Sequence, residues 1–268
     1  MFSVIVYRED DLRNGDYFMN IWAHRGCSQR YPENTISAFA SAVQIDDLTG
    51  IELDIQMTKD GEIVIIHDER VDRTTDGVGY VKDFTYAQIR KLVIAAENGR
   101  KERIPSIIEV FDLIEDKMEK GLLLNIELKN SIVPYQGMEE RILKLTACRG
   151  IQNQIVYSSF NTKSVEKIKK MNPDVSIGIL DMKISDCLHK KINCFGKENI
   201  SVALHPFAFN MDISKEELSG QTVRAWLSES LYPEKSEKTN LELKKMEIMG
   251  ITDVFLNNPE MYLGQREL

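Results

Sequence analysis

Short, almost continuously apolar runs alternate with longer segments of helical periodicity along most of this chain. Each run spans four to six residues, which is typical of strands buried on both faces of a parallel sheet. We expect nine strands, at Asn20–Ala23, Gly50–Asp54, Glu62–Ile66, Leu122–Glu127, Gln154–Ser158, Val175–Leu180, Ser201–Leu204, Val223–Trp226 and Thr252–Leu256.

Helix start and stop signals lie between these runs. A polar capping residue, alone or in a box with a glutamate three residues later, marks the start of a helix, and a glycine just past the last turn marks its end. We expect helices to begin at Asn34, at the Ser106/Glu109 box, at Asn161 or Thr162, and at the Ser214/Glu217 box. The last long helix should end at Gly250.

The alternation of strands and helices from Asn20 to Leu256 indicates an α/β protein, either a barrel or a doubly wound sheet. Polar side chains suited to catalysis follow several different strands. This distribution favours the barrel, in which functional groups from many strands gather at the C-terminal rim. We therefore predict a (β/α)8 TIM barrel.

Nine strand candidates are one too many for eight barrel positions. The segment Lys59-Asp60-Gly61-Glu62 contains a strong signal for a two-residue hairpin loop. An antiparallel hairpin in that register would place His67 opposite Asp54, at the rim. The alternative is a parallel barrel strand reached without a helix, but the link is shorter than a parallel crossover usually needs. We favour the hairpin.

Five polar fragments end or follow the apolar runs, and their side chains would meet at one rim. They are Ala23-His24-Arg25-Gly26, Pro32-Glu33-Asn34-Thr35, Glu52-Leu53-Asp54, His67-Asp68 and Ile126-Glu127-Leu128-Lys129. Carboxylates that hold a hard cation, cationic groups that hold a phosphate and imidazoles that move protons are the groups needed for metal-assisted attack on a phosphate diester.

Three carboxylates are the candidate metal ligands. Glu52 and Asp54 lie two positions apart on one strand and therefore point to the same face, and Glu127 ends another strand. Buried together, these carboxylates would repel one another unless a cation lay between them. Oxygen ligands favour one divalent cation, Mg²⁺ or Ca²⁺. The alternative is that all three are solvated charges beyond the strand ends.

His24 and His67 are the candidate catalytic residues, because an unperturbed imidazole can act as acid or base near neutral pH. Zinc is disfavoured because both rings are needed for proton transfer. The other two histidines, His189 and His205, lack neighbouring catalytic groups, although His205 ends a strand and can line the rim.

Arg25 and Lys129 are candidate phosphate-binding residues, because arginine grips phosphate bidentately and lysine supplies a compact positive charge. Lys129 lies two residues beyond Glu127 and shares its face; the alternative is a solvated loop lysine. We expect Glu33 to orient Arg25 or to bind a substrate hydroxyl.

The order, spacing and flanking residues of the five fragments resemble the glycerophosphodiester phosphodiesterase family, from about Ile21 to Pro259. The segment Arg73–Gly79 resembles the family's RTT-(N/D)-G-x-G stretch, which leads into a small insertion at the barrel mouth, here about residues 68–104. The resemblance implies acid and base roles for His24 and His67. It also implies hydrolysis of glycerophosphodiesters to glycerol 3-phosphate and an alcohol.

Two segments depart from the family pattern. Trp226 stands where Trp or Tyr is usual, and its ring can pack on glycerol carbons, but Leu-Ser-Glu follows it in place of Thr-Val-Asn. Asn257 stands where the family has the aspartate of Thr-Asp-x-Pro. These departures keep alternatives open: a phospholipase-D-like or cyclising phosphodiesterase on a lysolipid, or a non-catalytic barrel that binds phosphodiesters.

The composition limits the expected partners and cellular location of the protein. The 268 residues are 43% hydrophobic and 28% charged, as in ordinary globular proteins, and the net charge of −8 argues against nucleic-acid or anionic-membrane partners. Four scattered cysteines, an N-terminus without a signal-peptide pattern and the lack of a long apolar span predict a cytoplasmic protein with no stable membrane anchor. We expect residues 1–18 to form a leader or arm and residues 19–268 a single domain that acts on a small molecule.

Overall fold

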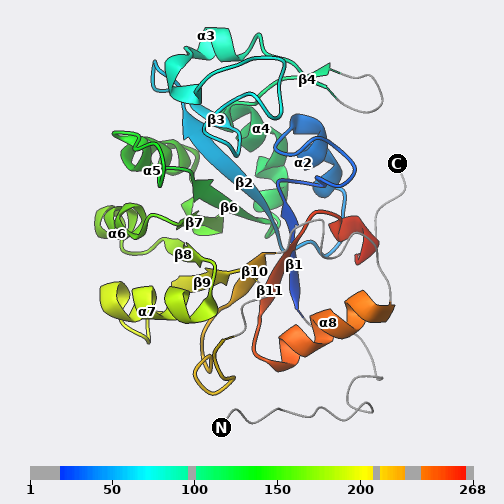
Figure 1. Cartoon of the computed structure of the whole chain (residues 1–268), viewed down its shortest axis with the longest axis vertical. Helices are drawn as coiled ribbons and strands as arrows, with labels where there is room; N and C mark the ends of the chain where they lie inside the picture. Colours follow the sequence, from blue (N-terminus) through cyan, green and yellow to red (C-terminus); the bar gives the residue numbers. More distant parts are fainter. Residues whose placement is uncertain (1–18, 96–100, 208–211, 227–236, 264–268) are drawn as a thin grey trace.

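Eight parallel strands form a nearly closed barrel in the computed structural model, which describes residues 19–95, 101–207, 212–226 and 237–263 (Figure 1). The order around the barrel is β10-β11-β1-β2-β6-β7-β8-β9, and isolated parallel bridges at Leu204–Val223 and Phe207–Trp226 link β9 to β10. The strands are β1 (Asn20–His24), β2 (Gly50–Met57), β6 (Leu123–Leu128), β7 (Ile155–Ser159), β8 (Ser176–Asp181), β9 (Val202–Pro206), β10 (Arg224–Trp226) and β11 (Asp253–Leu256).

Helices follow most of the strands and cover the barrel (Figure 1). They are α2 (Ile36–Ala42), α4 (Ile107–Met118), α5 (Met138–Arg149), α6 (Thr162–Met171), α7 (Ile184–Phe195) and α8 (Glu237–Ile248). The described residues between β9 and β10 form turns instead of a helix. The predicted TIM barrel is therefore confirmed. Among the described residues, no helix is long and apolar enough to cross a membrane.

The ninth predicted strand, β3 (Ile63–Ile65), pairs with β2 in antiparallel orientation and lies outside the barrel order. The predicted hairpin is confirmed, but its register is wrong by one residue. Met57 pairs with Ile63, because the loop uses Lys59, Asp60 and Gly61, with Gly61 at a φ of 85°. A three-residue loop of this kind ends in a left-handed glycine, so Asp54 faces Ile66 and His67 lies one position further on.

Two of the four predicted helix starts agree with the structure, and two need correction. The Ser106/Glu109 box opens α4 as predicted, and α6 begins at Thr162. Thr35, not Asn34, caps α2, because the Asn34 side chain is used elsewhere. The Ser214/Glu217 hydrogen bonds form, but residues 215–220 are turns and not a helix. Gly250 follows the last turn of α8, with a φ of 102°.

The segment after β3 builds a small layer at the top of the view in Figure 1. It contains η1 (Val81–Asp83), α3 (Tyr86–Ile89) and the hairpin of β4 (Ile94–Ala95) and β5 (Lys101–Glu102). Apolar side chains of this segment pack with two residues of the β3 region into a cluster separate from the barrel core: Val64, Ile66, Val71, Val81, Ile89, Ile94 and Ile104.

The N-terminal half of the barrel interior is closed by a polar and aromatic layer. Trp22 is fully buried and donates its indole N–H to Asp253 over 2.8 Å, and the Arg224 guanidinium lies 5.3 Å from the Trp22 ring centre. Gly50 makes room for this ring, since a Cβ there would lie 2.4 Å from it. The candidate residues lie in the other, C-terminal half of the barrel interior.

Candidate active site

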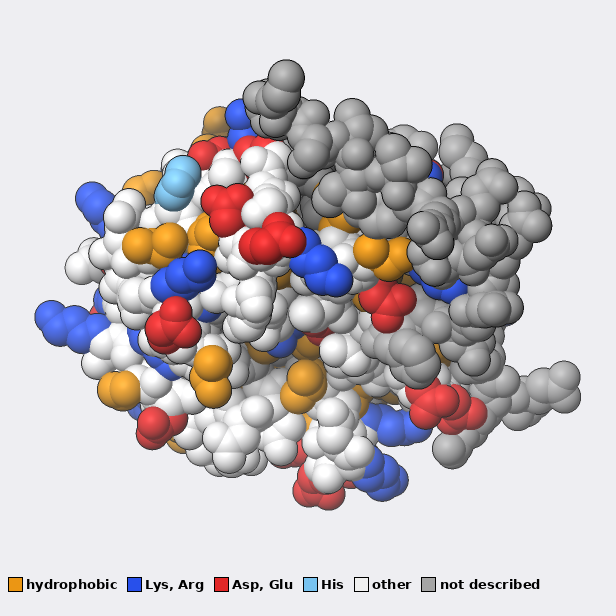
Figure 2. Space-filling model, turned by 90° about the horizontal axis from the view of Figure 1, so that it is seen from below, with side chains coloured by type: hydrophobic (Ala, Val, Ile, Leu, Met, Phe, Trp, Pro, Cys, Tyr) orange, Lys and Arg blue, Asp and Glu red, His pale blue; other side chains and the backbone are white. Residues whose placement is uncertain are grey.

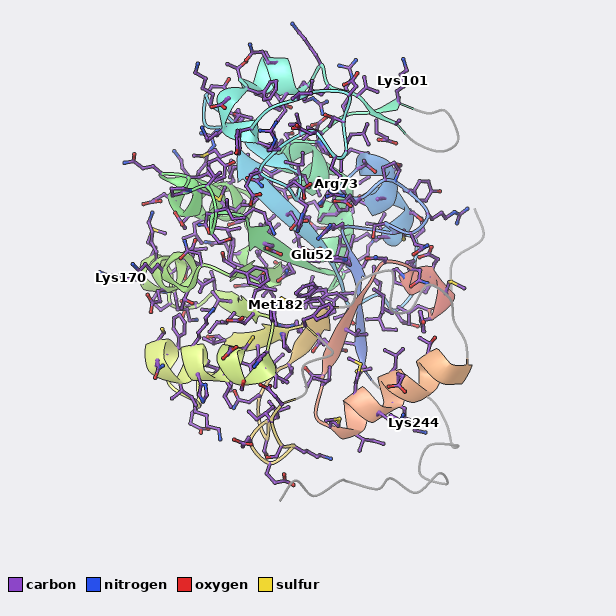
Figure 3. The ribbon with its side chains drawn as sticks, viewed as in Figure 1. Glu52, Arg73, Lys101, Lys170, Met182 and Lys244 are labelled. Atoms are coloured by element: carbon purple, nitrogen blue, oxygen red, sulfur yellow. The ribbon has the colours of Figure 1, made fainter. Side chains whose placement is uncertain are left out.

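A cavity of about 50 Å³ opens among the C-terminal ends of the strands. Seven of the nine predicted site residues line it, and they lie on or directly after β1, β2, β6, β10 and the hairpin strand β3. The full lining is His24, Arg25, Glu52, His67, Asn125, Glu127, Lys129, Phe160, Leu180, His205, Trp226 and Phe255. Figure 3 shows Glu52 near the centre of the ribbon, with Arg73 between it and the upper layer.

Three carboxylates meet beside this cavity. Oxygen atoms of Glu52, Asp54 and Glu127 lie within 4.8 Å of one another, and all three residues are buried. Burial, together with the charge of Asp54, raises the pKa of Glu52 well above its usual value. Burial also raises the pKa of Glu127, although Lys129 opposes the effect. Carboxylates in such a cluster are unstable as anions unless further positive charge is supplied.

The pKa of Asp54 is shifted in the opposite direction. Burial acts to raise its pKa, but Arg25, His67 and Lys129 outweigh burial and lower it. The Oδ2 atom accepts from Asn34 at 2.8 Å and lies 3.1 Å from Arg25 Nε, whereas Oδ1 is buried without a hydrogen-bond partner in the described part of the chain. An ionised carboxylate with a free buried oxygen, facing two further carboxylates, is a set of hard oxygen donors that fits a divalent cation.

Two cationic side chains border the carboxylates. Arg25 has a φ of 56°, in the left-handed region, and this turn directs its backbone N–H to Glu52 Oε2 at 3.0 Å. Its guanidinium contacts both Asp54 and Glu33. Lys129 Nζ lies 2.8 Å from Glu127 Oε1 and 3.9 Å from Asp54 Oδ1. Both groups line the cavity and stay positively charged, as phosphate binding requires.

The two histidines have different partners. His24 Nδ1 lies 2.6 Å from Asn257 Oδ1, an atom that only accepts, so Nδ1 carries the proton and Nε2 has a free lone pair. Burial and the charge of Arg25 lower the pKa of His24 to about 3. The ring is therefore neutral at physiological pH, with Nε2 at 3.9 Å from Glu52 Oε2.

His67 is supported by a carboxylate instead. Its Nδ1 donates to Asp68 Oδ1 at 2.6 Å, while Lys129 Nζ lies 3.1 Å from Nε2 and can donate to it. Although burial opposes ionisation, hydrogen bonds from Arg73 and His67 lower the pKa of Asp68 to about 2. Asp68 is thus an anion that fixes the tautomer of His67 and directs its Nε2 toward Lys129.

Arg73 connects the two sides of the rim. Its guanidinium donates to Glu33 at 2.7 and 2.9 Å and to Asp68 at 2.6 and 3.1 Å. Glu33 in turn accepts from Arg25, so that one chain of ion pairs runs from Arg25 to His67. The predicted contact of Glu33 with Arg25 is present in the structure.

The opposite side of the cavity is aromatic. Trp226 packs edge-on against Phe160 at 6.3 Å between ring centres and lies 4.5 Å from the Phe207 ring. The cavity thus joins a charged side to an apolar side, which suits a phosphate ester with a small organic group. Away from the barrel interior, acidic and basic side chains are interspersed over the face drawn in Figure 2.

Several residues at the site were not predicted to act there. The sequence predicts Asn34 as a helix cap, but its side chain bonds Asp54 instead. Its Nδ2 donates to the Asp54 carboxylate, and its Oδ1 accepts from the Asp54 backbone N–H. Asp68 and Asn257 belong to the motifs described above, but the sequence does not predict their contacts with the histidines. Asn125 was overlooked, although it lies two residues before Glu127 and therefore shares its face.

Acidic groups that need a cation, cationic groups beside them and two imidazoles in one barrel mouth define a hydrolase of phosphate esters. Comparison with known proteins narrows this class. Residues 24–261 match the Glycerophosphoryl diester phosphodiesterase family, and the chain belongs to that family. The enzyme class inferred from the sequence is thereby confirmed.

Individual relatives agree with this placement. The chain is 45% identical to a glycerophosphodiester phosphodiesterase of Caldanaerobacter subterraneus subsp. tengcongensis, over 70% of this chain and 76% of that protein. It is 32% identical to one of Bacillus altitudinis, over 92% and 98% of the two chains. A solved structure of an Oleispira antarctica phosphodiesterase in complex with sn-glycerol-3-phosphate is similar, with a TM-score of 0.71, 25% identity and coverage of 91% and 95%.

Proposed function

We propose that the protein hydrolyses glycerophosphodiesters to glycerol 3-phosphate and an alcohol, with the help of one divalent cation. The observation that carries the proposal is the contact of a buried carboxylate cluster with Arg25 and Lys129 at the wall of one small cavity. The complex of a similar Oleispira antarctica phosphodiesterase with sn-glycerol-3-phosphate supports the choice of product.

Glu52, Asp54 and Glu127 would hold the cation, which would be Mg²⁺ or Ca²⁺ because all three ligands are hard oxygen donors. When bound, the cation supplies Lewis acidity and neutralises negative charge that develops on the phosphate oxygens. Arg25 and Lys129 bind other phosphate oxygens and keep the phosphorus in place for attack.

The histidines move the protons. Both carry their proton on Nδ1 and leave Nε2 as the acceptor, so either can take a proton from the attacking oxygen. The ring that acts as the acid must enter the step with a second proton on Nε2; it gives this proton to the oxygen of the departing alcohol, and the proton taken up by the base replaces it before the next turnover. The attacking oxygen belongs to water or to the glycerol hydroxyl next to the ester.

We place this activity in the cytoplasm. All four cysteines, Cys27, Cys148, Cys187 and Cys194, are free thiols in the structure, as is usual for proteins of a reducing compartment. The partner is a small phosphodiester rather than a nucleic acid, since the cavity holds only a few water-sized groups.

A panel of glycerophosphodiesters, assayed by coupled detection of glycerol 3-phosphate, tests the proposal. Glycerophosphocholine, glycerophosphoethanolamine and an intact lysolipid would be compared with and without EDTA. We expect activity on the soluble diesters that is abolished by EDTA and restored by Mg²⁺ or Ca²⁺. Asp54→Asn should raise the cation concentration required, whereas Lys170→Ala, on the molecular surface, should not. Full activity in excess EDTA, or activity on lysolipid alone, would refute the proposal.

A further inference from the structure

The inner end of the cavity carries two polar side chains that the reaction scheme does not use. Asn125 and His205 line the cavity, with 2% and 0% of their surfaces exposed. Asn125 Oδ1 and His205 Nδ1 are both buried, and neither has a hydrogen-bond partner in the described segments. Buried polar atoms are nearly always paired with protein, water or ligand, so these two atoms indicate a bound group.

The contacts of His205 determine whether its unpartnered Nδ1 is a hydrogen-bond donor or an acceptor. Burial and the nearby Arg224 lower the pKa of His205 well below its usual value, so the ring is neutral. Arg224 Nη1 lies 3.5 Å from Nε2 and can only donate, which leaves the ring proton on Nδ1. The unpartnered atom is therefore a donor. Gly178 makes room for the ring, because a Cβ there would lie 2.3 Å from it.

Asn125 presents the complementary atom. Its Nδ2 donates to Ser158 Oγ over 3.0 Å, and this bond leaves Oδ1 as a free acceptor. Trp226 adds a second donor, since its indole nitrogen is buried in the same wall without a partner among the described residues. Donors and an acceptor thus converge on one small cavity beside aromatic rings.

Hydroxyl groups fit this arrangement, because each can both donate and accept a hydrogen bond. The aromatic faces suit the attached carbon atoms. The cavity volume of about 50 Å³ accommodates a few water-sized groups, such as those of a short polyol. A short polyol attached to phosphate meets all three conditions.

We propose that Asn125 and His205 determine specificity for the glycerol moiety, with Asn125 Oδ1 accepting from one glycerol hydroxyl and His205 Nδ1 donating to a glycerol oxygen. The proposal rests on the proposed function, because it assigns a part of the same substrate. It explains why a barrel whose charged side suits any phosphate ester would select one that carries a polyol.

Binding of sn-glycerol 3-phosphate and of inorganic phosphate, measured by calorimetry with Mg²⁺ present, tests the proposal without requiring turnover. We expect wild-type protein to prefer glycerol 3-phosphate. Asn125→Leu and His205→Leu should weaken glycerol 3-phosphate binding by about 10-fold or more and leave phosphate binding within about 2-fold, since a site built to hydrogen-bond a hydroxyl loses that preference when its partner is removed.

Milder variants guard against loss of folding. His205→Asn keeps a donor near the position of Nδ1 and should retain most of the preference, whereas Asn125→Ser should lose it. Ser158→Ala is the matched control, because it removes the partner of Asn125 Nδ2 and leaves the Oδ1 acceptor. Equal losses for both ligands, unchanged binding of both, or no preference in the wild type would overturn the proposal. A wild-type preference without phosphodiesterase activity would refute the proposed function alone.

Discussion

His24 and Asn257 lie 233 residues apart in the chain and are joined by a hydrogen bond of 2.6 Å. Asn257 directly follows β11, which is the neighbour of β1 in the barrel, so closure of the sheet brings the two side chains together. The other histidine has a carboxylate, Asp68, at the same distance. The two rings are therefore held in the same tautomer by partners of different charge.

Removal of the Asn257 amide should slow the reaction. We expect Asn257→Ala to lower kcat by about 10- to 100-fold with little change in KM, because the variant frees the His24 ring to rotate without touching the phosphate-binding groups. Asn257→Asp should keep the position of the ring and add a negative charge. Since that charge raises the pKa of His24, the acidic limb of the pH–rate profile should move to higher pH. An unchanged profile for Asn257→Asp would contradict this assignment.

Loss of either cavity histidine should be more damaging. His24→Ala and His67→Ala should each reduce kcat by about 10² to 10⁴, the range typical of lost general acid–base catalysis. Binding of glycerol 3-phosphate, measured by calorimetry, should largely survive. His189→Ala is the control, because His189 is exposed on α7. A greater loss for this control than for either cavity histidine would show that the site is misplaced.

Neutralising Glu52 should stabilise the metal-free protein while it abolishes activity. The folded-state pKa of Glu52 is raised above its usual 4.5 by burial and by Asp54, so its proton is held more tightly in the folded state than in the unfolded state. Protonated Glu52 therefore adds to the free energy of unfolding of the metal-free protein below about pH 4.5. This contribution is lost as the pH rises through the folded-state pKa of Glu52.

Glu52→Gln should remove this decline. Thermal unfolding in EDTA between pH 5 and 8 should show a higher Tm for the variant, with the difference growing as the pH increases. Addition of Mg²⁺ or Ca²⁺ should raise the Tm of the wild type and have little effect on the variant. The prediction fails if the wild type is the more stable of the two in EDTA at pH 8.

The attacking group can be identified with a modified substrate. One cluster of three carboxylates favours a single cation, whereas direct attack by water usually employs a metal pair. A substrate hydroxyl beside the phosphorus also has a large proximity advantage. We expect a diester whose adjacent glycerol hydroxyl is removed or methylated to bind but to turn over very slowly, with a cyclic phosphate detectable by ³¹P NMR for the parent substrate. Equal rates would identify water as the nucleophile.

The strands and the metal-ligand cluster were accessible from the sequence because they depend on local patterns. Each predicted strand overlaps an observed one, since runs buried on both faces leave a clear apolar signature. The spacing of Glu52 and Asp54 alone places both on one face. The hairpin register was missed because a glycine after aspartate fits two-residue and three-residue loops equally well, and the choice moves every later pair by one position.

Contacts that depend on closure of the barrel could not be predicted from the sequence. Asn34 and Thr35 are both good capping residues, and the choice of Thr35 follows from the contact of Asn34 with Asp54 on another strand. The partner of His24 comes from the other end of the chain. The state of His205 on β9 depends on Arg224, which reaches it from the next strand, β10. No local sequence pattern predicts these contacts between distant residues.

Because of the antiparallel strand β3, the side chains of the site come from two parts of the molecule, the barrel and the segment outside it. His67 reaches the rim from a hairpin outside the barrel, and its partner Asp68 is held by Arg73 from the layer that follows. The carboxylates come from barrel strands. The position of His67 is thus encoded outside the barrel, whereas the candidate metal ligands and His24 are encoded on barrel strands, so the outer layer can diverge in length and sequence while the ligand set is preserved. A barrel that exchanged this layer for another would keep its candidate ligand set and His24 and would receive a different side chain in place of His67.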